Sequence, residues 1–123
     1  MITSPPTWNS IRATAQGTIE LFDAFATTHL ITDQFVADHI GFKCASTVEF
    51  IAMRALLEEA SLFVYQSIIS QRRIAICRLR EPMQTVCGPV AFVELSDQKP
   101  DGSQTSGFDH IEMYPIDHDV QHG

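Results

Sequence analysis

The chain has 123 residues, which is the length of one domain and too short for two independent folding units. Hydrophobic residues make up 45% and charged residues 19%, which excludes a disordered tail or a coiled coil. A net charge of -7 repels phosphate backbones and anionic lipids, so we expect neither nucleic acid nor a membrane as a partner.

The N-terminal half is predicted to begin with a helix over residues 8–29, because apolar residues recur there every three or four positions. Residues 1–7, which include two prolines, form a loose arm before it. Residues 35–44 alternate as a strand. One side carries Val36, Ile40, Phe42 and Cys44, and the other carries Ala37, His39, Gly41 and Lys43.

The C-terminal part is predicted to be mainly strands. Ser46 followed by Glu49 is a capping-box pattern that starts a second helix, to about Ala60. Apolar, β-branched runs then predict strands at 62–69, 74–79 and 86–95. Residues 97–107 have the composition of a surface loop, residues 108–114 form a last strand, and residues 115–123 form a flexible tail.

This order of elements predicts an α+β fold in a single domain, with residues 8–114 as the globular unit. It is a β-α-β-β-β module with an N-terminal helix and a further strand, and the helices cover one face of a curved mixed sheet. We expect the other face to be open and concave, with Phe92 and Val90 on it.

Two features of the sequence bear on location and redox state. No stretch approaches the roughly 18 apolar residues of a membrane span, and no signal peptide begins the chain, so we expect a cytoplasmic protein. The three cysteines are an odd number at long spacings, which fits neither a disulfide framework nor a CxxC motif. We therefore interpret them as small, buried, reduced residues.

Three polar residues fall on the strand face away from the helices: His39, Glu94 and His110. Two imidazoles and a carboxylate suit a divalent ion such as Zn²⁺, Mn²⁺, Fe²⁺ or Ni²⁺. Each residue also has an alternative interpretation without a metal ion. His39 would be a hydrogen-bonded core or edge histidine, Glu94 a solvated carboxylate at a strand end, and His110 a histidine at the junction of a loop and a strand. Glu112 and Tyr114 share the predicted face of His110 and are further candidates to line a pocket.

Other charged residues are interpreted more conservatively. Asp38 and Asp109 precede the two histidines and can orient an imidazole, but alternation favours solvated positions at strand starts. Arg72, Arg73, Arg78 and Arg80 are expected on a solvated strand face, the alternative being a guanidinium that binds an anionic oxygen substrate. His118 and His122 fall in the tail and are given no role. The six glycines are scattered, so nucleophile elbows and phosphate-binding loops are disfavoured.

An internal repeat links the two histidines, since Asp-His-Ile opens an apolar strand at both 38–40 and 109–111. This arrangement resembles the vicinal oxygen chelate superfamily, which is built from paired β-α-β-β-β modules. Within it the chain is similar to the YecM-type proteins, predicted metal-binding relatives of glyoxalases and extradiol dioxygenases. The resemblance is carried by residues 37–40, 73–84, 93–95 and 109–112.

The resemblance implies that His39, Glu94 and His110 are metal ligands. It also implies isomerase, glyoxalase-like or dioxygenase-like chemistry on a small oxygenated substrate. YecM-like proteins continue through a second module, whose last ligand has no counterpart here. Two interpretations follow: a truncated or divergent relative, or a homodimer in which a second copy completes the site. The alternative function is a binding or dimerisation module without turnover.

Overall fold

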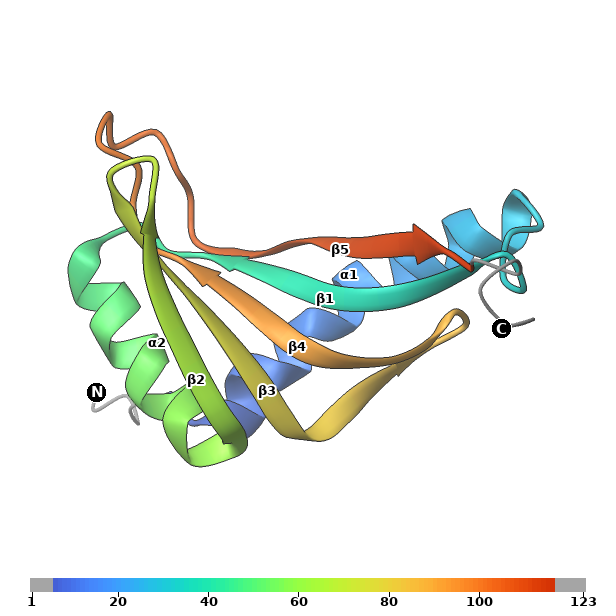
Figure 1. Ribbon diagram of the computed structural model, residues 1–123, viewed down its shortest axis with the longest axis horizontal. Helices are drawn as coiled ribbons and strands as arrows, with labels where there is room; N and C mark the ends of the chain where they lie inside the picture. Colours follow the sequence, from blue (N-terminus) through green and yellow to red (C-terminus); the bar gives the residue numbers. More distant parts are fainter. Residues whose placement is uncertain (1–5, 117–123) are drawn as a thin grey trace, which may run out of the picture.

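The computed structural model describes residues 6–116, which form two helices and one five-stranded sheet (Figure 1). The elements are α1 (Trp8–Thr28), β1 (Phe35–Lys43), α2 (Thr47–Ala60), β2 (Ser61–Ile69), β3 (Arg72–Thr85), β4 (Gly88–Ser96) and β5 (Gly107–Pro115). The predicted α+β class and order of elements are confirmed. Thr7 and Ser10 form a capping box that starts α1, and the Ile116 amide donates to the Gln34 carbonyl.

The sheet is curved and mixed, with the strand order β2-β3-β4-β1-β5 (Figure 1). β1 lies between β4, with which it is parallel, and β5, with which it is antiparallel. α1 packs against β5 and β3, whereas α2 packs against β2, β3 and β4. Neither helix is long and apolar enough to cross a membrane, within the part of the chain that the structure describes.

The core lies between the helices and the sheet. Ser46 caps α2 by accepting a hydrogen bond from the Glu49 amide, and this orients the buried Phe50 and Leu57 toward the sheet. Burial of each such side chain contributes roughly 1.5–3 kcal/mol. The cysteines are buried and free, as predicted. Desolvation by burial raises the pKa of Cys44 and of Cys77 to about 12, so both thiols stay protonated.

Two register shifts correct the predicted strand faces. β1 has a bulge between Ala37 and His39, so Ala37 is buried and Val36 is exposed, the reverse of the expectation. The pairing of β3 with β4 also shifts, and Val90 lies in the core rather than beside Phe92 on the open face. In β1 the one unpaired residue, Asp38, inverts the alternation on either side of it, whereas in β3 residues 79–82 face only Ala91 of β4. Sequence alternation alone cannot reveal either irregularity.

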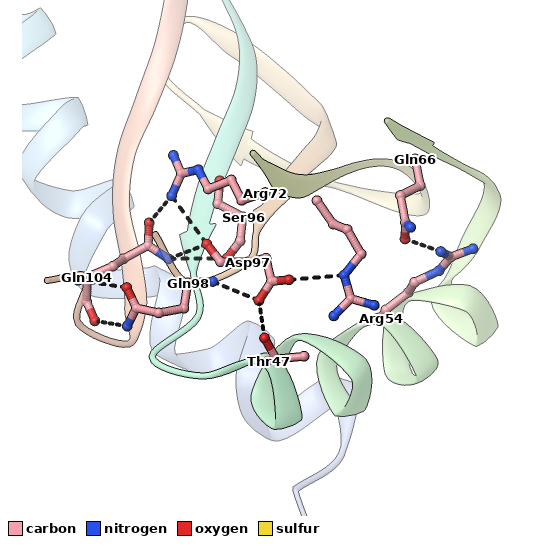
Figure 2. A network of polar contacts seen from close by, with 9 residues as sticks. Thr47, Arg54, Gln66, Arg72, Ser96, Asp97, Gln98 and Gln104 are labelled. Atoms are coloured by element: carbon pink, nitrogen blue, oxygen red, sulfur yellow. Dashed lines mark hydrogen bonds and ion pairs between the residues drawn. The ribbon is translucent and has the colours of Figure 1, made fainter. Parts of the chain in front are cut away.

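A polar network holds the loop between β4 and β5 against the end of the sheet (Figure 2). The buried Gln104 amide donates to the carbonyls of Cys44, Ser96 and Asp97 at 2.7, 3.3 and 2.9 Å. Its oxygen accepts a hydrogen bond from Arg72 at 2.5 Å. The buried Asp97 carboxylate pairs with Arg73 at 3.0 Å. Arg72 and Arg73 are therefore structural, not part of a solvated face.

Replacing Gln104 by leucine should destabilise the fold, because the change keeps the volume but leaves the Cys44 carbonyl without its donor and removes the acceptor of Arg72. We expect the free energy of unfolding, measured with urea, to fall by about 1–3 kcal/mol. Gln84→Leu is the matched control, since Gln84 is exposed on β3. A loss for Gln104→Leu no larger than that of the control would contradict a stabilising role for the network.

Candidate metal centre

The two histidines meet across the antiparallel pair of β1 and β5. His39 faces Glu112, Ile40 faces Ile111, and Gly41 faces His110. This register places a local twofold axis near the Ile40–Ile111 pair, and His39 and His110 take equivalent positions about it. Their rings lie 6.0 Å apart between centroids, edge to face. The repeated Asp-His-Ile pattern therefore corresponds to two equivalent strand segments that lie side by side.

Each histidine is preceded by a bulge residue. The register shifts leave Asp38 of β1 and Asp109 of β5 without a partner in the strand pair. Asp38 Oδ2 lies 2.9 Å from His39 Nδ1, and Asp109 Oδ1 lies 2.6 Å from His110 Nδ1. The expectation that these aspartates are merely solvated is wrong, because a bulge turns each carboxylate toward the imidazole that follows it. Both aspartates orient their neighbours.

The opposite ring nitrogens face glutamates. His39 Nε2 lies 3.3 Å from Glu94 Oε2, and His110 Nε2 lies 4.0 Å from Glu112 Oε2. An imidazole whose Nδ1–H donates to a carboxylate has a lone pair on Nε2 when it is neutral. His39 Nε2 and the Glu94 carboxylate are then two acceptors in contact. A cation between them, either a proton or a metal ion, removes this conflict.

The structure places Glu94 in contact with His39, but the ligand atoms that lie close enough together to share one ion do not include those of Glu94. Glu94 pairs in register with Gly41, which faces His110, and the Glu94 carboxylate contacts His39. The group instead consists of His39, His110 and Glu112, whose ligand atoms all lie within 4.8 Å of one another. Glu112 was expected only to line a pocket. The signal for it was its position two residues after His110, on the same strand face.

Negative charge is concentrated around the two histidines. Asp38, Glu94, Asp109 and Glu112 surround the two imidazoles, and among residues 6–116 no lysine or arginine forms an ion pair with any of them. His39 is 15% exposed and Glu94 29%, so the centre is accessible but partly shielded from water. Tyr114 pairs with Val36, outside the cluster. The tail histidines, His118 and His122, lie outside the described residues.

Gly41 provides the space that the His110 ring occupies. A Cβ atom at this position would lie 2.3 Å from Cε1 and 2.8 Å from Nδ1 of His110. Any side chain at position 41 therefore forces the imidazole out of place.

Comparisons with known proteins point to one family. A family model described as "YecM protein" matches residues 12–121. No curated protein matches the chain. A solved structure titled "Structural Genomics, Protein EC4020" superposes with a TM-score of 0.66 and 23% sequence identity, over 98% of this chain and 69% of that one. That similarity supports the fold.

The substitution Gly41→Ala should displace His110 while leaving the sheet intact, since a histidine ring can rotate away more easily than a strand can move. We expect the hydrogen bond from His110 Nδ1 to the Asp109 carboxylate to be lost, and the nitrogen chemical shifts of His110 to report this loss by NMR. Gly17→Ala is the control, because a Cβ atom there meets nothing within 4 Å. An unchanged His110 signal would contradict the close approach at Gly41.

Proposed function

The chain belongs to the YecM family, and from this premise we propose that it binds one divalent metal ion at the His39–His110 pair. The ligands in this proposal are His39, His110 and Glu94, with Glu112 as a fourth donor. The contact between His39 Nε2 and the Glu94 carboxylate is the observation that carries the proposal. Asp38 and Asp109 hold the other ring nitrogens, as carboxylates commonly do behind metal-binding histidines.

The excess of carboxylates around the two imidazoles supports a bound cation. One divalent ion offsets two of the four neighbouring carboxylates and can take donors from both imidazoles. Imidazole nitrogen with carboxylate oxygen is a donor set suited to Zn²⁺, Mn²⁺, Fe²⁺ or Ni²⁺. The residues present therefore fit the group that the family resemblance implies.

The proposed role is vicinal oxygen chelate chemistry on a small oxygenated substrate, of an isomerase, glyoxalase-like or dioxygenase-like kind. The bound ion would supply Lewis acidity that stabilises negative charge developing on a substrate oxygen. The protein's own contribution is positioning. The two aspartates fix the orientation of both rings, and Gly41 leaves room for one of them.

Metal content tests this proposal directly. We expect about one equivalent of Zn²⁺ per chain by equilibrium dialysis and elemental analysis. His39→Ala and His110→Ala should abolish it, and Asp38→Asn should weaken binding by about 10–100-fold, because the aspartate orients a ligand. His29→Ala is the control, since His29 lies at the C-terminal end of α1, outside the strands that carry the site. The double variant His118→Ala/His122→Ala excludes binding by the tail.

Two outcomes would refute the metal proposal. One is a folded wild-type protein that takes up no divalent ion at saturating concentration. The other is a His39→Ala variant that binds as tightly as the wild type.

We also propose that two copies associate through the edge strand β2. This strand has no charged residue, and its exposed apolar side chains are Leu62, Phe63, Tyr65, Ile68 and Ile69. A free edge offers unpaired backbone groups, and a neutral one avoids the repulsion between two chains of net charge -7. An antiparallel β2–β2 contact would join the two sheets about a twofold axis.

Sedimentation velocity at micromolar concentration should detect this dimer. Ile68→Lys should give a monomer, because Ile68 is 75% exposed on β2 and a lysine there opposes edge pairing. Val48→Lys is the control, since Val48 is 77% exposed on α2. A monomeric wild type, or a dimer that survives Ile68→Lys, would contradict association through β2.

A further inference from the structure

The candidate metal centre continues into an aromatic surface with a free arginine. Strand register places five residues in one row across the whole sheet, in the order Phe63, Arg78, Phe92, His39 and Glu112. They lie on the face that the helices leave open. Neighbouring strands are about 4.8 Å apart, so the backbone of Arg78 lies about 10 Å from that of His39, with Phe92 between them.

The aromatic residues form a flat support. The rings of Phe63 and Phe92 meet edge to face, with 6.4 Å between centroids. The Arg78 guanidinium lies over the Phe92 ring, 5.8 Å from its centroid. A cation–π contact of this kind holds the guanidinium in place while leaving its N–H groups toward solvent.

Arg78 differs from the two arginines at the start of β3. Arg72 donates to Gln104, and Arg73 pairs with Asp97. Arg78 is exposed, and among residues 6–116 its side chain makes no hydrogen bond or ion pair with the protein. Apart from its contact with the Phe92 ring, the guanidinium is therefore free to bind a ligand within the part of the chain that the structure describes.

We propose that Phe63, Arg78 and Phe92 form a subsite for a flat carboxylate, such as an aromatic acid of one ring. The guanidinium binds the carboxylate through two parallel hydrogen bonds, and Phe92 supports the flat body of the molecule. The other end of the molecule then reaches toward His39. This proposal rests on the proposed function, because it identifies the class of substrate whose far end would reach the metal site.

The charges along this row of residues fit the proposed orientation of the ligand. The carboxylates of the centre repel an anionic group, and Arg78 is the cation of the row, on the other side of Phe92. A carboxylate at Arg78 and neutral or weakly acidic oxygens near His39 therefore define one orientation of the substrate. The subsite also needs no metal ion, so it can be tested by itself.

Benzoate is the probe, titrated into the metal-free, isotope-labelled protein and followed by NMR. We expect saturable shifts of the Phe63 and Phe92 rings and of Arg78 Nε. Arg78→Gln should weaken benzoate binding by about tenfold or more, because charge-assisted hydrogen bonds are lost. Arg80→Gln, two residues further along β3, is the matched control and should leave the affinity unchanged.

Two further ligands separate the contributions of charge and shape. Benzyl alcohol keeps the ring without the charge, and inorganic phosphate keeps the charge without the ring. Both should bind at least about tenfold more weakly than benzoate if the carboxylate and the aromatic support act together. Zn²⁺ uptake, measured in parallel, should be unaffected by Arg78→Gln, so failure of the subsite and failure of the metal site are distinguishable.

The proposal is overturned if benzoate causes no saturable shifts at these residues. It is also overturned if Arg80→Gln weakens binding as much as Arg78→Gln, or if phosphate binds as tightly as benzoate. Arg78 is exposed, so the Arg78→Gln variant should fold, and an unchanged spectrum away from the face will verify that.

Discussion

The pairing of β1 with β5 is the constraint on which the site depends. The antiparallel register makes His39 and His110 equivalent, and a bulge in each strand turns an aspartate toward the ring that follows it. A β-bulge normally re-aims one side chain. Here two bulges fix two imidazoles, and both Nε2 atoms face carboxylates. Gly41 completes the arrangement because only a residue without a Cβ atom leaves space for His110.

One face of the sheet contributes to stability, and the other carries the polar residues of the candidate site. Residues such as Ile40, Val93 and Leu95 face the helices and are fully buried, so stability depends mainly on that side. The alternate residues carry the carboxylates, the imidazoles and Arg78, which are costly to bury and are left accessible. At one end, Gln104 and Asp97 fasten the connecting loop between β4 and β5 (Figure 2). The polar face can therefore vary in chemistry without disturbing the core.

Much of the fold was predictable because its signals are local. The Ser46–Glu49 pattern gave α2, and the alternation of residues 35–44 gave β1. The errors arose where one residue interrupts a strand pair, as at Asp38, and no residue type marks such a bulge. Alternation placed His39 and Glu94 on one face, and their side chains are in contact. Glu112 was undervalued, because its nearness to both histidines depends on the pairing of β1 with β5. The structural roles of Arg72 and Arg73 could not be predicted, because they depend on where the loop between β4 and β5 lies.

The position of β1 in the sheet also bears on how the chain folds. β1 precedes α2, β2 and β3 along the chain, yet its two neighbours are β4 and β5, which are formed from the last third of the described residues. Both of its pairings therefore close long loops, whose entropy cost precedes any stabilising contact. The β2–β3 hairpin closes locally through the two-residue turn Ser70–Gln71, in which both φ angles are positive. Folding should accordingly begin at this hairpin with α2, and the strand that carries His39 should be incorporated late, together with β5.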